Sequence, residues 1–141
     1  MHVRRHAHER GANLVEAAVV IPLLLMILVG VVDLGRAYFT YITVIDAARE
    51  GARYGASHPA DADRDAQICA MVLAEAQGQP LPVSLSCANA TINTTGAPGT
   101  PVRVTVTVDF PVIMGGLLGR STFPISYSVA FRIRCEVGST C

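Results

Sequence analysis

Apolar residues are concentrated near the start of the chain. Residues 12–32 read ANLVEAAVVIPLLLMILVGVV, and most of this stretch is apolar. No charged residue lies between Ala17 and Val32. A helix that crosses a bilayer needs about 20 predominantly apolar residues. The stretch from Leu14 to Val32 is close to this length and therefore predicts a membrane span.

The apolar pattern continues beyond this span at steps of three and four residues, which is typical of an amphipathic helix. The positions concerned are Leu34, Tyr38, Tyr41, Ile42, Ile45, Ala48 and Ala52. We expect one helix from Asn13 to Tyr54, about 63 Å long at about 1.5 Å per residue. Gly55 is expected to end it, with Pro59 soon after. Pro22, inside the span, predicts a kink, which is either a harmless bend or a hinge.

The pattern changes to a mixture of one short helix and several strands in the second half. Residues 62–76 predict the helix. Residues 83–87, with an extension over 90–93, predict a first strand, and 102–110 and 123–134 alternate between apolar and polar positions as strands do. We expect a three- or four-stranded antiparallel sheet packed on the short helix and on the distal half of the long one.

Charge indicates how the span is oriented. Arg4, Arg5 and Arg10 precede it, and Asp33 follows it. The positive-inside rule then places the N-terminus in the cytoplasm and the bulk of the chain outside. A cleaved secretory signal peptide is an alternative, but the apolar core is long and the small-x-small site at 35–37 is weak.

The composition narrows the classes of function. The formal net charge is zero, and all 11 basic residues are arginines. No domain-wide positive excess supports binding to nucleic acid. An even number of cysteines on the exported side is consistent with two disulfides. One arrangement pairs Cys69 with Cys87 and Cys135 with Cys141, and the other pairings stay open.

Glu16 is the single acidic residue inside the apolar run. A carboxylate near a bilayer core is costly and is a functional candidate by default. Glu16 could instead close a capping box with Asn13 at the start of the helix.

The residues around Glu16 resemble a known processing signal. Arg10 and Gly11 precede Ala12, and Glu16 is the fifth residue after the Gly11–Ala12 bond. This resembles the class III signal of type IV pilins and pseudopilins, which a prepilin peptidase cuts after glycine. The resemblance implies a mature chain that starts at Ala12, whose new ammonium pairs with Glu16 of the same or a neighbouring subunit as a register device.

Two further segments narrow the resemblance to one family. Residues 14–36 (LVEAAVVIPLLLMILVGVVDLGR) and 45–56 (IDAAREGARYGA) resemble TadE-like proteins, the pseudopilins of tight-adherence (Tad/Flp) pilus systems. Family members more often carry an aromatic residue beside the glutamate, where Ala17 stands here. The resemblance implies an α+β, pilin-like fold with a leader at 1–11, a membrane and stalk helix at 12–55, and an exported domain at 56–141.

The same resemblance implies a structural role in the inner membrane or in an extracellular filament used for adherence. Expected partners are other pilin subunits through the N-terminal helix, the prepilin peptidase, the inner-membrane assembly platform, and lipid before assembly. The alternative is a single-pass membrane protein whose exported β-rich domain binds a partner without being polymerised.

Catalytic chemistry is not expected. The sequence has no Gly-rich phosphate loop, no CxxC and no G-x-S-x-G motif. Asp61, Asp63 and Asp65 suggest a calcium loop, but the glycine and distal glutamate of an EF-hand are missing. We therefore expect a protein that is not an enzyme and holds neither metal nor cofactor.

Overall fold

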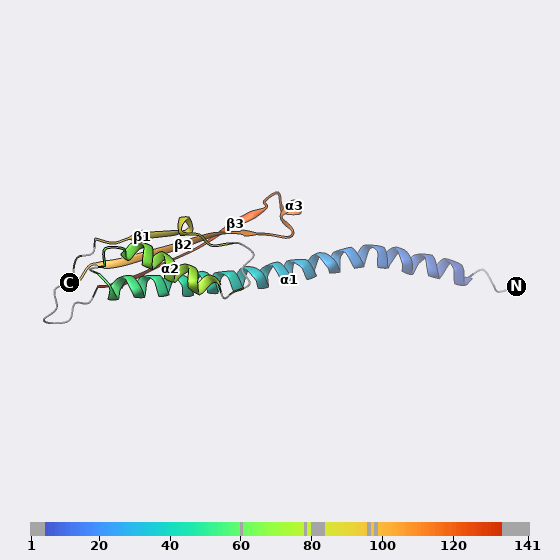
Figure 1. The fold of residues 1–141 in the computed structure, drawn as a ribbon. Helices are drawn as coiled ribbons and strands as arrows, with labels where there is room; N and C mark the ends of the chain where they lie inside the picture. Colours follow the sequence, from blue (N-terminus) through green and yellow to red (C-terminus); the bar gives the residue numbers. More distant parts are fainter. Residues whose placement is uncertain are drawn as a thin grey trace.

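The computed structural model describes residues 5–59, 61–77, 79, 84–95, 97 and 99–133 of the 141-residue chain. The long helix α1 (Arg5–Ser57) projects from a small α+β domain that packs on its C-terminal half (Figure 1). The other described elements are α2 (Arg64–Gln77), the 3₁₀ turn η1 (Cys87–Asn89), β1 (Ala90–Asn93), β2 (Pro101–Pro111), the single-turn α3 (Gly115–Leu118) and β3 (Thr122–Arg132). The predicted α+β, pilin-like layout is confirmed.

The sheet is antiparallel, in the order β1-β2-β3. The side chains of β2 alternate between buried and exposed positions, as the sequence predicts. The buried positions of β2 are Val102, Val104, Val106, Val108 and Phe110. In the register, Val106 lies between Ala90 of β1 and Tyr127 of β3.

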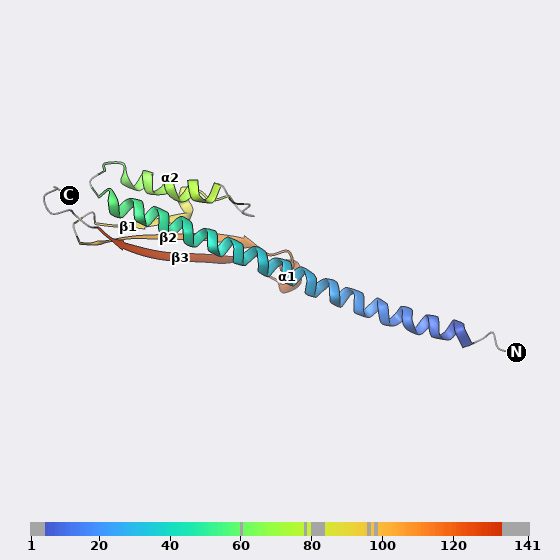
Figure 2. The same ribbon diagram turned by 90° about the horizontal axis from the view of Figure 1, so that it is seen from below.

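The two helices cover one face of this sheet (Figures 1 and 2). Their buried side chains form a single core with the valines of β2. The helical members of this core are Val44, Ala47, Ala48, Ala52, Ile68 and Val72. Each buried valine or isoleucine contributes about 1.5–3 kcal/mol relative to exposure, so this contact holds α1 and the domain together as one unit.

The buried surface of α1 differs from the predicted one. Leu34 and Tyr38 are 72% and 65% exposed, whereas Thr40 and Thr43 are buried. The two hydroxyl groups donate to the carbonyls of Arg36 and Phe39 one turn earlier, so their burial leaves no unpaired donor. The helix turns its small side chains to the domain because they allow close approach, and it leaves its larger ones outside.

Gly55 does not end the helix as predicted. It is buried inside α1, which continues to Ser57. A Cβ at Gly55 would lie 2.6 Å from Ile68 Cδ1 and 2.9 Å from Val102 Cγ1. Glycine is needed at this position for packing against α2 and β2 rather than for a turn.

The first predicted strand is also corrected. Residues 84–86 are irregular, η1 follows, and only the expected extension forms β1; Val83 lies outside the described residues. Asn89 explains the turn, because its Oδ1 accepts a bond of 2.9 Å from the Ser86 N–H. Its Nδ2 donates to the Thr107 carbonyl at 2.9 Å. This side-chain bond replaces the backbone bond that a longer β1 would make to β2 beyond the Ala90–Val106 pair.

Candidate functional site

The N-terminal part of α1 makes almost no contact with its own domain. Side chains from Asn13 to Leu28 are exposed, with Leu14 at 73% and Leu24 at 61%. Within the described residues α1 is the one helix that is long and apolar enough to cross a membrane, and its apolar window is 0% buried. An apolar surface of this size is suited to contact with lipid or with other helices.

The predicted processing residues lie just before this exposed part of α1, and the predicted register residue Glu16 lies on it. Gly11 and Ala12 belong to the continuous helix, and Glu16 follows Ala12 by one turn, with its side chain exposed. Residues four apart share a helix face. Within the described part of the chain Glu16 has no ion-pair or hydrogen-bond partner.

The helix stays continuous through Pro22. Figure 1 shows this part of α1 as a gentle curve. Membrane helices tolerate an internal proline when neighbouring groups satisfy the freed carbonyl.

Asp33, at the end of the apolar run, links α1 to the connection between β2 and β3. It is 8% exposed, and its carboxylate accepts bonds from the Ile113 N–H (3.2 Å) and the Met114 N–H (3.1 Å). Arg36 Nη1 lies 3.3 Å from the same carboxylate, and its guanidinium stacks 5.4 Å from the Phe110 ring centroid. We call this arrangement of Asp33 and the two N–H groups the Asp33 clamp. The sequence pattern indicated Asp33 only as a flank of the span, because an acidic residue gives no sign of a partner far along the chain.

An open apolar groove of about 320 Å³ lies beside the Asp33 clamp. Its lining comes from α1 and from both strands of the β2–β3 hairpin. The residues are Gly30, Asp33, Leu34, Ala37, Phe110, Val112, Met114, Phe123 and Ile125. The groove therefore joins the apolar part of α1 to the end of the hairpin.

The segment at 45–56 forms a packing surface. Ala47, Ala48, Gly51 and Ala52 are buried, and a Cβ at Gly51 would lie 2.6 Å from Val72 Cγ2. The charged positions of the segment face outward and pair along the helix. Arg53 Nε donates to Glu50 Oε2 at 2.9 Å, and this bond lowers the pKa of Glu50 from its usual 4.5.

Residues 11–53 match the family model described as TadE-like protein. This segment is TadE-like. No curated protein and no solved structure matches the chain.

The TadE-like segment begins at the predicted processing site and ends in the packing surface of α1. It includes Glu16, Pro22 and Asp33, whereas the sheet and α2 lie outside it. The family match thus covers the apolar part of α1 together with the surface that attaches the domain.

Beyond the TadE-like segment, Cys69 and Cys87 form a disulfide with a Cα–Cα distance of 5.6 Å. It links α2 to η1, close to the expected link between the short helix and the first strand. Cys135 and Cys141 lie outside the described residues.

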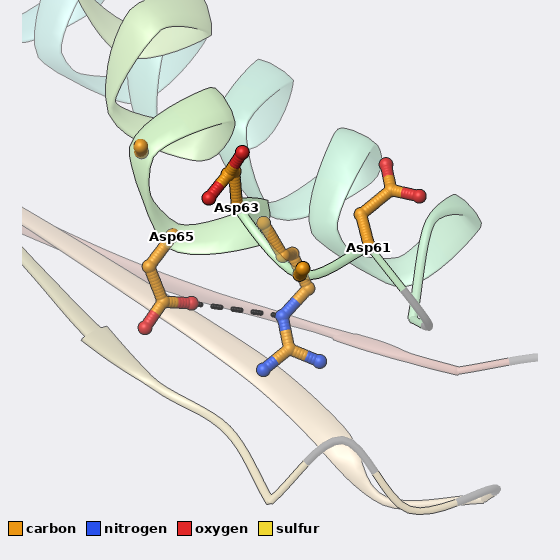
Figure 3. A pocket seen from close by; sticks show the side chains of 6 residues that line it. Asp61, Asp63 and Asp65 are labelled. Carbon is orange, nitrogen blue, oxygen red and sulfur yellow. Dashed lines mark ion pairs between the residues drawn. The ribbon is translucent and has the colours of Figure 1, made fainter.

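The three aspartates before and at the start of α2 do not converge. In Figure 3 the carboxylates of Asp61, Asp63 and Asp65 point in different directions. Asp65 Oδ1 lies 3.6 Å from Arg64 Nε, and Tyr54 Oη donates to Asp61 Oδ2 at 3.4 Å. Burial of the ring and this neighbouring carboxylate both raise the pKa of Tyr54. Among the described residues no group of three metal-ligating side chains is found.

Proposed function

We propose that the chain is a pseudopilin-type subunit of a Tad pilus system. In this proposal the helix anchors the subunit in the inner membrane with the domain exported. The subunit is then assembled into, or primes, an extracellular filament used for surface adherence. The observation that carries the proposal is the exposed apolar part of α1, which lies within the TadE-like match to residues 11–53.

The proposed mechanism is physical. Before assembly, lipid surrounds residues 13–32; after assembly, helices of neighbouring subunits replace the lipid. Small residues at helix surfaces permit close approach in such packing. Ala17, Ala18 and Gly30 supply them here, and no atom lies within 4 Å of a Cβ placed at Gly30. The role requires no catalytic group, cofactor or metal.

Processing and register form the second part of the proposal. A prepilin peptidase cuts between Gly11 and Ala12, and the assembly platform in the inner membrane receives the product. The new ammonium of Ala12 then lies one turn from an exposed carboxylate at Glu16. A charged pair in low dielectric contributes little net stability, but it can fix the axial position of one subunit against the next.

Mass spectrometry of the N-terminus tests processing. We expect the wild-type chain to begin at Ala12 and a Gly11→Val variant to retain its leader. Gly35→Ala serves as the matched control, because a Cβ at Gly35 meets no atom within 4 Å. A wild-type chain that keeps Met1 would overturn the processing step.

Imaging of purified surface filaments tests assembly. We expect filaments containing the wild-type chain, and far fewer with Glu16→Ala, although this variant should still be processed. Glu75→Ala, which removes an exposed acidic residue on α2, should assemble as the wild type does. Normal filaments from Glu16→Ala would refute the register role. A processed chain absent from all filaments would favour a single-pass membrane protein whose exported domain binds a partner.

A further inference from the structure

The end of the β2–β3 hairpin points back along α1 toward its apolar part (Figures 1 and 2). Ile113 lies at this end with 59% of its side chain exposed, and Phe123 at the start of β3 is 39% exposed. We call residues 112–121 the hairpin tip. Phe123 and Leu34, which is 72% exposed, line the same apolar groove, so exposed apolar side chains of the hairpin and of α1 lie together here.

The Asp33 clamp fixes the position of the hairpin tip along the axis of α1. The two N–H groups held by the carboxylate belong to Ile113 and Met114, which are residues of the tip. Met114 and Gly30 both line the apolar groove. Gly30 lies three residues, or about 4.5 Å, before Asp33 along α1.

Helix geometry puts this position of the tip at the membrane surface when residues 14–32 cross a bilayer. The stretch from Leu14 to Val32 measures about 28 Å at about 1.5 Å per residue, close to the roughly 30 Å hydrocarbon thickness. If these residues span the bilayer, Asp33 lies where α1 leaves the hydrocarbon, and the groove opens among the lipid head groups.

Charges and rings near the tip also suit an interface between lipid and water. Residues 110–133 contain no acidic residue. The Arg120 guanidinium lies 5.9 Å from the centroid of the partly exposed Phe123 ring. An arginine suits a boundary between lipid and water, because its apolar stem packs against apolar groups while the guanidinium stays hydrated.

We propose that the hairpin tip is a second membrane contact of this protein. Ile113 and the mouth of the apolar groove lie in the head-group layer of the leaflet from which α1 emerges, so the exported domain rests on the lipid. This inference depends on the membrane-anchored state of the proposed function and not on filament assembly. Lipid is the favoured occupant because the clamp holds the tip at the end of the span.

Tryptophan substitution in the full chain tests this contact, because the natural sequence contains no tryptophan. The chain is placed in vesicles that contain lipids brominated near the head-group end of their acyl chains. We expect Ile113→Trp to give blue-shifted emission that these lipids quench. Ala130→Trp is the control outside the membrane, because Ala130 is exposed and lies about nine residues, or roughly 30 Å, along β3 from the tip.

Leu24→Trp measures whether α1 lies inside the bilayer. It therefore distinguishes failure of the tip contact from failure of the membrane anchor. Quenching of Leu24→Trp by lipids brominated deep in the chain, without quenching of Ile113→Trp, would overturn the tip contact alone. Absence of quenching in Leu24→Trp would overturn the membrane anchor and with it the proposed function. Quenching of Ile113→Trp that is lost as the protein-to-lipid ratio rises would show that a second copy covers the tip in place of lipid, and it would also overturn the proposal.

Discussion

Replacing Asp33 by alanine removes the acceptor of two backbone N–H groups at once. Hydrogen bonds to a charged group contribute about 1.5–3 kcal/mol each, and water at the exposed tip recovers part of this. The two bonds measure 3.2 and 3.1 Å. We expect their loss to lower the free energy of opening of the hairpin tip by about 2 kcal/mol, which raises the opening equilibrium constant about 30-fold. Asp33→Asn keeps one acceptor oxygen. We therefore expect it to lower the free energy of opening of the tip by about 1 kcal/mol, which raises the opening equilibrium constant about fivefold.

Hydrogen-exchange mass spectrometry of the full chain in lipid nanodiscs measures this opening. The peptide that covers residues 112–121 should exchange faster in Asp33→Ala, while the peptides of β2 and α2 stay unchanged. Asp46→Ala is the matched control, because Asp46 is half-exposed and lies 3.8 Å from Arg49. If exchange of the Ile113 and Met114 amides in Asp33→Ala stays within about twofold of the wild type, the clamp does not hold the tip.

Three further changes test the packing, the disulfide and an ion pair. Gly55→Val should destabilise the domain by about 3 kcal/mol in urea unfolding followed by circular dichroism, because its methyl groups overlap the side chains of α2 and β2. Cys87→Ala should lower the stability by about 3 kcal/mol, because the disulfide to Cys69 closes a loop with a sequence separation of 18. Arg53→Ala should raise the pKa of Glu50 toward 4.5 in an NMR titration, because the guanidinium that now lowers it is lost.

Each of these changes has its own control. Gly35→Val places the same side chain on an open part of α1, so it should leave the stability nearly unchanged. Cys69→Ala should lower the stability by the same amount as Cys87→Ala, because both variants lack the same disulfide. The lowered pKa of Glu50 means that the ion pair stabilises the folded chain above the unfolded pKa and stops doing so as the pH falls through the folded pKa. An unchanged pKa in Arg53→Ala would contradict this assignment.

Local patterns were sufficient to predict the longer elements of the fold, α1, α2, β2 and β3. The apolar run and its helical continuation predicted α1, and the alternation of valine with polar residues predicted β2 and which of its faces is buried. These signals arise from the helical and strand periodicities, which are properties of the backbone. They do not depend on what lies against the element.

What the sequence could not predict depends on contacts between distant segments. Asp33 follows an apolar run as any flanking acid does, and only the hairpin end brought against it makes it a clamp. Gly55 looked like a helix stop because glycine often is one, whereas the approach of Ile68 and Val102 determines its role. The strand expected before Cys87 is replaced by a turn because the amide of Asn89 reaches across to β2.

The direction of the strands relative to α1 has a mechanical consequence. β2 and β3 run lengthwise beside the distal half of the helix (Figures 1 and 2). A pull on the membrane end of α1 therefore loads its contact with the sheet in shear, and the small side chains that pack there must all slide together. Forces carried in this way are shared by many weak contacts, whereas a pull across the helix would peel them apart one at a time.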